Sequence, residues 1–230
     1  MTTLIFHGDD QAQSRQNLHQ AIAKLKQAQV QIKWLAGDKL SPADLEIELR
    51  TQNLFQTEAL VIENLLSRPR SKIKQKCLNL LISYQGSKLI FFWDKKALTP
   101  TILKSLQPLK PQVKLFKLPT FLFKFLDNFK PGNSKILLTL FHQTLKLTNE
   151  QVVFVMLTKR LSQLIQAKTQ PQLLKGAPWQ KKQLLNQVQT WQLNQLIKLH
   201  HQLFKIDYLI KTGQTKLNLV DQLDLLILEL

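Results

Sequence analysis

The residues of this chain that could do chemistry follow its first apolar segment. His7, Gly8, Asp9 and Asp10 come directly after residues 3–6. A phosphate-binding loop needs spaced glycines whose amides cradle phosphate, then a lysine and a hydroxyl for charge and magnesium. This stretch has a single glycine, no Gly-Lys-Ser/Thr sequence, and two carboxylates that would repel a nucleotide. We therefore expect no intact ATPase site, and we expect Asp9 and Asp10 to cap a helix.

Histidine and cysteine chemistry is equally unsupported. None of the five histidines has the spacing of a metal-binding motif, and His200 and His201 are neighbours that would point about 100° apart on a helix. The single cysteine, Cys77, excludes an internal disulfide and a cysteine-rich zinc site. The chain also lacks a pairing of residues typical of a Ser-His-Asp or two-carboxylate enzyme. We expect no metal, no cofactor and no intrinsic catalysis.

The strongest bulk property is a net charge of +17 over 230 residues. Both halves of the chain are basic, which favours a polyanion such as DNA or RNA, or an acidic protein, as a partner. A lysine-rich solvated surface would explain the charge without any partner. The densest basic run could contact DNA phosphate or an acidic protein surface, or form an ordinary solvated helix face; it comprises Arg68, Arg70, Lys72, Lys74 and Lys76.

The first half of the chain alternates short apolar runs with segments of helical periodicity. This alternation predicts an α/β domain with a parallel sheet over residues 1–120. Ser41 and Pro42 have the types expected at the cap and first turn of a helix. The expected strands are 3–6, 32–34, 59–62, 89–93 and 113–117, and the expected helices are 13–29, one from 41, 71–83 and 100–106.

After Pro119 only helical patterns remain, so residues 121–230 are predicted to form a bundle of about five helices. Ser134 is expected to cap the second of them. Residues 152–157 are apolar all round and are expected to be central. Gly213 is expected to end a long helix that runs over residues 193–211.

One short segment, between the helix from 41 and the strand 59–62, holds two adjacent large apolar residues. Leu54 and Phe55 follow the polar residues Gln52 and Asn53. Neighbouring apolar side chains cannot both face inward from a helix end or a tight connection. The pair either folds back onto the sheet or forms a hydrophobic plug that enters a pocket on another protein.

This segment, followed by a strand that ends in Val61, Ile62, Glu63 and Asn64, resembles the delta subunit of the bacterial DNA polymerase III clamp loader. In that family the leucine-phenylalanine wedge inserts into the sliding clamp and holds its ring open. The far end of the chain agrees. Asp207, Lys211, Thr212 and Gly213 resemble the family's Asp-x-x-x-Lys-Thr/Ser-Gly signature in the C-terminal collar, and residues 157–161 are similar to its Leu-x-Arg-Gln-Leu segment.

The resemblance implies a degenerate AAA+-like parallel-sheet nucleotide-binding fold without a P-loop, followed by a helical collar that joins loader subunits. It also implies a non-catalytic part of the DNA-directed DNA polymerase holoenzyme, with clamp binding by residues 52–55. The implied partners are the sliding clamp (beta subunit), ATP-hydrolysing and delta-prime-like loader subunits, and primer-template DNA through the complex. The chain departs from the family in leaving no room for a lid domain between Thr120 and Phe121.

Two other functions stay open at this stage. The chain could be a basic DNA- or RNA-binding protein on a degenerate nucleotide-binding fold, whereas an NTP-using enzyme is disfavoured by the missing phosphate loop. Asp207 and Lys211 are expected to form a structural i,i+4 ion pair. No apolar run approaches the ~18 residues of a membrane span and no signal peptide is evident, so we expect no membrane partner and a cytoplasmic location.

Overall fold

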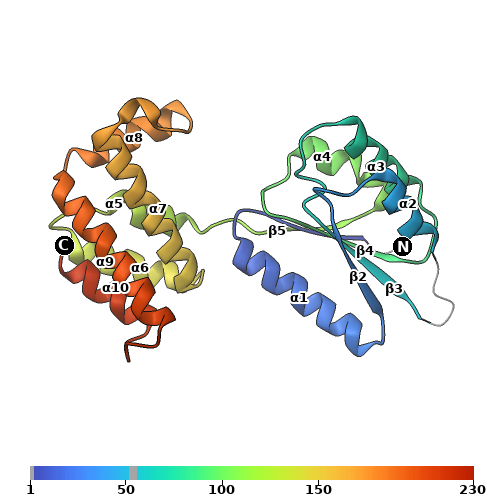
Figure 1. The fold of residues 1–230 in the computed structure, drawn as a ribbon, viewed down its shortest axis with the longest axis horizontal. Helices are drawn as coiled ribbons and strands as arrows, with labels where there is room; N and C mark the ends of the chain where they lie inside the picture. Colours follow the sequence, from blue (N-terminus) through green and yellow to red (C-terminus); the bar gives the residue numbers. More distant parts are fainter. Residues whose placement is uncertain (1–2, 52–55) are drawn as a thin grey trace. The chain divides into compact units, whose positions relative to one another are not determined.

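The computed structural model describes residues 3–51 and 56–230. The chain divides into two compact units, Met1–Leu118 and Pro119–Leu230 (Figure 1). Residues 116–119 alone separate the last strand of the first unit from the first helix of the second. The two units are therefore joined by a short connection.

The first unit is built on a five-stranded sheet in the order β2-β3-β4-β1-β5, and every strand pair is parallel. The central strands β3 and β4 are buried along nearly their whole length, as expected for strands covered on both faces, whereas the edge strands β2 and β5 are largely exposed. The prediction of a parallel sheet is confirmed. The strands are β1 (Thr3–His7), β2 (Gln31–Ala36), β3 (Glu58–Glu63), β4 (Leu89–Asp94) and β5 (Gln112–Leu115).

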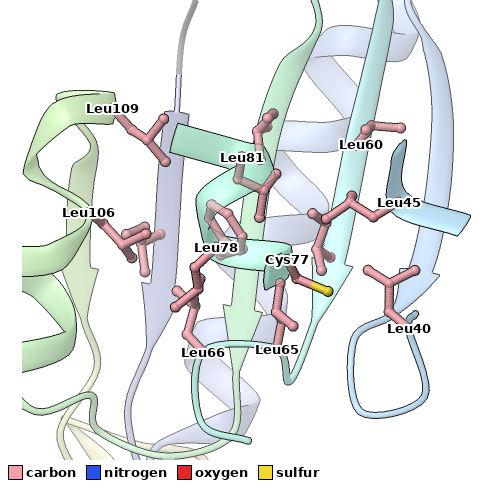
Figure 2. Close-up of a cluster of buried hydrophobic side chains, with 14 of the residues drawn as sticks. Leu40, Leu45, Leu60, Leu65, Leu66, Cys77, Leu78, Leu81, Leu106 and Leu109 are labelled. Carbon is pink, nitrogen blue, oxygen red and sulfur yellow. The ribbon is translucent and has the colours of Figure 1, made fainter. Parts of the chain in front are cut away.

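Helices cover both faces of this sheet. On one face α1 (Gln11–Gln27) packs Leu18 and Ile22 against Phe6 and Val61. The other face carries a larger cluster of leucines from α2 (Pro42–Arg50) and α3 (Lys72–Ser83), together with residues that flank α4 (Pro100–Ser105) (Figure 2). The apolar side chains of each helix thus lie on one stripe, which is what fixes each helix to its own face of the sheet.

Two predicted caps position the first helices. The Ser41 hydroxyl accepts a hydrogen bond from the Asp44 amide at 3.1 Å, and Pro42 occupies the first turn of α2. The Asp10 carboxylate accepts a hydrogen bond from the Gln13 amide at 3.0 Å and caps α1. A carboxylate in that role satisfies an amide that has no partner inside the helix. The capping interpretation is confirmed for Asp10.

The second unit is entirely helical. Its residues are all described, and they form six α-helices, one more than the approximate five expected from the sequence: α5 (Thr120–Asn128), α6 (Ser134–Leu145), α7 (Glu150–Thr169), α8 (Pro178–Val188), α9 (Leu193–Lys211) and α10 (Leu219–Leu228). The prediction for Ser134 was wrong, since it is the first residue of α6 and follows the cap residue Asn133. Val155 is also 59% exposed, so the apolar start of α7 is not central on all sides.

Aromatic residues organise the centre of this bundle. Phe125, Phe129 and Phe141 are fully buried, and the Trp191 ring stacks on Phe129 with ring centroids 5.8 Å apart. The Trp191 indole N–H donates to the Phe129 carbonyl at 3.3 Å, and Gln187 donates to the same carbonyl at 2.9 Å. Both bonds satisfy the carbonyl of Phe129, the residue that caps the end of α5, which no helical amide reaches. Of the other tryptophans, Trp93 is buried, whereas Trp34 and Trp179 are exposed.

The residues of the predicted signature, Asp207, Lys211 and Gly213, lie in or just after the last part of α9. Lys211 and Asp207 form an exposed ion pair on α9 with an N–O distance of 2.7 Å, as expected. Gly213 follows the helix with φ of +67°, a left-handed conformation that favours glycine. Its amide donates to the Ile210 carbonyl, and the next amide donates to the Leu209 carbonyl at 2.9 Å. These two bonds close α9 as a Schellman motif.

None of the helices that the structure describes is long and apolar enough to cross a membrane. Within residues 3–51 and 56–230, no group of three or more histidine, cysteine, aspartate or glutamate side chains is arranged to hold a metal ion.

Candidate functional site

The residues predicted to bind a clamp, Gln52, Asn53, Leu54 and Phe55, lie outside the described residues. What the structure does describe is the protein on either side of them. Before them, α2 ends at Arg50 and Thr51; after them, Gln56 and Thr57 lead into β3 at Glu58. The two flanks are thus the end of helix α2 and the start of strand β3.

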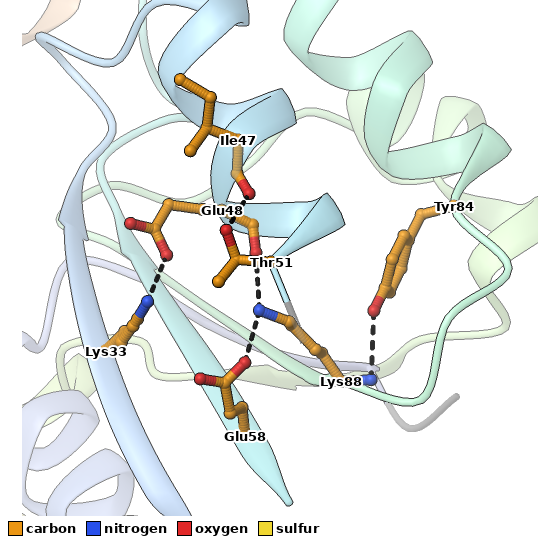
Figure 3. Close-up of polar contacts among 7 residues, drawn as sticks. All are labelled: Lys33, Ile47, Glu48, Thr51, Glu58, Tyr84 and Lys88. Carbon is orange, nitrogen blue, oxygen red and sulfur yellow. Dashed lines mark hydrogen bonds and ion pairs between the residues drawn. The ribbon is translucent and has the colours of Figure 1, made fainter. Parts of the chain in front are cut away.

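A buried lysine joins the two flanks. The Lys88 ammonium lies 2.5 Å from the Glu58 carboxylate at the start of β3 and donates to the Glu48 carbonyl in the last turn of α2 at 2.6 Å (Figure 3). Lys88 and Glu58 are 2% and 5% exposed. Buried charges are costly to leave unpaired. Lys88 therefore holds the start of β3 through the ion pair with Glu58 and the end of α2 through the hydrogen bond to the Glu48 carbonyl. The span that residues 52–55 must bridge is thereby set by the fold.

Further polar contacts hold the flank of α2. The Glu48 side chain accepts from the Lys33 ammonium at 2.9 Å, and this hydrogen bond raises the pKa of Lys33 (Figure 3). Both the amide and the hydroxyl of Thr51 donate to the Ile47 carbonyl, at 2.9 and 2.8 Å. The helix is therefore closed at Thr51, and the chain leaves it there in an extended conformation.

Nothing in the sequence singles out Lys88. It is one lysine among many in a basic chain, and its distance of 30 residues from Glu58 matches no motif. The one local signal is that Lys88 directly precedes a strand that the sequence predicts to be fully buried. A charged residue at the end of a buried strand is itself removed from water and so needs a partner.

The five residues of the predicted basic run do not form a single exposed surface. Arg70, Lys72 and Lys76 are exposed. Lys74 is buried, contrary to the expectation for a solvated run, and burial lowers the pKa of its ammonium. Arg68 is half-buried and donates to the Leu40 carbonyl at 3.1 Å. Two of the five cations therefore contact other parts of the fold, and the other three face solvent.

The turn after β1 is closed where a phosphate loop would be open. Gly8 has φ of +140°, and a Cβ at this position would lie 1.9 Å from the Phe116 carbonyl oxygen. The Phe116 amide donates to the His7 carbonyl at 2.8 Å, and the Asp10 amide donates to the Phe116 carbonyl at 3.2 Å. Backbone from residue 116 thus occupies the inner side of the turn.

His7 ends β1 as a buried, neutral side chain. It is 2% exposed, and its Nδ1 accepts a hydrogen bond from the Leu98 amide at 3.0 Å. Burial lowers the pKa of His7 below its ordinary value of 6.5. Because Nδ1 is an acceptor, the neutral ring carries its proton on Nε2.

His7 should make folding sensitive to acid. As the pH falls below 6.5, the unfolded chain binds a proton that the folded chain does not yet bind, so the free energy of unfolding should decrease. His7→Asn, whose amide oxygen can still accept from the Leu98 amide, should lose this component. The measurement is urea unfolding at pH values above and below 6.5. His201→Asn, at an exposed histidine, should keep the wild-type pH dependence; equal curves for wild type and His7→Asn would contradict the assignment.

Comparison with known proteins finds solved structures of similar fold but no similar sequence. No family model matches the sequence, and no curated protein sequence matches it. Among solved structures, the DNA clamp loader delta protein (YqeN) of Bacillus subtilis aligns with 100% of this chain and 95% of its own, with a TM-score of 0.50 and 11% identity. A DNA polymerase III gamma subunit-related protein from Thermotoga maritima aligns with 89% of this chain and 67% of its own, with a TM-score of 0.34 and 16% identity. The chain therefore shares the fold of the Bacillus subtilis protein, and in this chain that fold is a parallel-sheet unit followed by a helical unit.

Proposed function

We propose that the chain is a non-catalytic, delta-like subunit of a bacterial DNA polymerase III clamp loader that binds and opens the sliding clamp. Its second unit would join it to ATP-hydrolysing and delta-prime-like subunits, and the assembled complex would meet primer-template DNA.

The observation that carries this proposal is the fold match over the entire chain. The alignment with a clamp loader delta protein covers 100% of this chain and 95% of that protein. The closed turn at Gly8 supports a subunit that itself binds no nucleotide. The signature residues lie at the end of the long helix α9, in the unit that would serve as the collar: Asp207 and Lys211 form an ion pair on the helix, and Gly213 follows its last turn.

The clamp-binding residues we propose are Leu54 and Phe55, with Gln52 and Asn53 beside them. Two features support this choice. The adjacent apolar pair stands between polar residues in a connection rather than in an apolar stripe. The flanks of that connection are fixed by Lys88, and a rigid support reduces the conformational entropy that a short segment loses on binding.

The test is direct binding of the wild-type chain to the purified sliding clamp of the same organism, measured by biolayer interferometry with the clamp immobilised. We expect a stable complex that needs no nucleotide. A chain that neither binds the clamp nor co-purifies with the ATP-hydrolysing loader subunits would contradict the proposal.

A basic DNA- or RNA-binding protein is the second candidate, and the exposed cations Arg70, Lys72 and Lys76 favour it. The salt dependence of the binding affinity distinguishes the two functions. Binding of nucleic acid by the isolated chain should weaken steeply as salt rises, because each neutralised phosphate releases counterions. Tight nucleic-acid binding together with no clamp binding would select this second function.

A further inference from the structure

A basic groove lies beside the carboxyl ends of β3 and β4, next to the first turns of α3 and α4. Its volume is about 700 Å³, and its lining includes Arg68, Arg70, Lys72 and Lys74. Among the described residues, those that line the groove include no aspartate or glutamate. Such a concentration of one charge is unfavourable unless an anion or solvent compensates it.

The inner wall of the groove is rigidly built. The Lys74 ammonium is buried and donates to the carbonyls of Leu66 and Arg68, at 2.6 and 2.7 Å. The buried Asp94 carboxylate accepts from the Ser67 amide at 2.7 Å. These contacts fix the loop that connects β3 to α3. The groove therefore keeps its shape without a ligand, which lowers the cost of binding one.

The outer wall supplies groups that a ligand can reach. Arg70 and Lys72 are exposed, and no ion pair to either of them is found among the described residues. The hydroxyl oxygens of Ser71 and Thr99 accept from helix amides at 3.2 and 3.5 Å, which leaves each hydroxyl hydrogen to donate outward. Thr101 adds a further exposed hydroxyl to the lining.

We infer that this groove binds the phosphodiester backbone of a nucleic acid, with Arg70 and Lys72 as the main phosphate contacts. Arginine, lysine and hydroxyl side chains are the groups that proteins use for phosphate and sugar contacts. The N-terminus of α3, at Ser71 and Lys72, adds a favourable dipole at the same place. A protein partner is less well matched, because Leu78 and Ile102 are the apolar part of the described lining and no aromatic residue in it could act as a buried anchor.

The test compares two double variants that remove the same charge. Arg70→Gln/Lys72→Gln changes the groove, and Lys24→Gln/Lys26→Gln changes exposed lysines on α1, which covers the opposite face of the sheet. Binding of a short fluorescent DNA duplex to the full chain is followed by anisotropy over a salt series, without clamp. We expect the groove variant to bind about ten-fold more weakly or worse and to lower the slope of log K against log salt by about 2, because two phosphate contacts are lost. The control variant should keep the wild-type slope.

Three outcomes would overturn the inference. The full chain fails to bind the duplex, the two variants lose the same affinity and slope, or the groove variant keeps DNA binding but loses binding to the immobilised clamp in the separate interferometry assay. The last outcome would assign the groove to a protein partner instead. Because the DNA-binding assay contains no clamp, a failure of this inference can be told apart from a failure of the proposed clamp binding.

Discussion

The double variant Leu54→Ala/Phe55→Ala is expected to bind the sliding clamp at least ~10²-fold more weakly than the wild-type chain. Burying two large apolar side chains in a pocket contributes ~1.5–3 kcal/mol each. The sum of ~3–6 kcal/mol corresponds to a factor of roughly 10² to 10⁴ in affinity. Biolayer interferometry with immobilised clamp measures the change, and it should appear mainly in the dissociation rate, as is usual for interface truncations.

The chain offers a matched control for this loss. Ile73→Ala/Leu115→Ala removes two apolar side chains, each 45% exposed, from the same unit but outside residues 52–55. This control should bind the clamp within about three-fold of wild type, because scattered exposed apolar residues carry little binding energy. Circular dichroism must show both variants folded. Equal clamp binding by wild type and the Leu54/Phe55 variant would assign the pair to core packing and remove the proposed site.

The parallel sheet was predictable because its central strands carry their signal locally. Residues 59–62 and 89–93 are short apolar runs, and strands covered on both faces need such runs. The caps Ser41 and Asp10 and the terminator Gly213 were predictable for the same reason, since the side chain or the backbone freedom of each acts within a few residues of itself. Local chemistry was therefore sufficient for these elements, although not for the cap of α6, which is Asn133 rather than Ser134.

The surroundings of the candidate site were not predictable, because they depend on contacts between distant residues. Lys88 meets Glu48 and Glu58 across 40 and 30 positions of the sequence, and only the register of the sheet brings them together. Lys74 looked like one of five equivalent cations, yet its place on the inward side of α3 buries it. A charged residue on the buried stripe of a helix is the pattern that would have separated Lys74 from its neighbours.

Both buried lysines lie in the first unit and serve the loops that carry the proposed binding surfaces. Lys88 fixes the flanks of residues 52–55, and Lys74 fixes the loop beside the basic groove. In a chain with a net charge of +17, two cations are thus withdrawn from solvent to position segments rather than to attract a partner. Replacing either buried lysine should therefore change the position of a loop more than it changes the charge of the surface.

Lys88→Met is expected to lower the free energy of unfolding of the first unit by about 3–5 kcal/mol. The substitution keeps the long apolar stem but leaves the Glu58 carboxylate buried without its cation, and it also removes the hydrogen bond to the Glu48 carbonyl. Removing one partner of a buried pair has an effect of about this size because the remaining charge is uncompensated. Hydrogen exchange of β3 and β4 amides under native conditions, read peptide by peptide, measures the loss in this unit.

The exposed pair on α9 provides the control for Lys88→Met. Lys211 and Asp207 are the same kinds of group at a similar distance, but their side chains are 72% and 38% exposed, so Lys211→Met should change the free energy of unfolding by less than about 1 kcal/mol. If Lys88→Met does not fold, Glu58→Gln/Lys88→Met should restore most of the stability, because the double change leaves no buried charge. A Lys88→Met protein as stable as Lys211→Met, or a double variant no better than the single one, would show that the Lys88 pair does not fix α2 to β3.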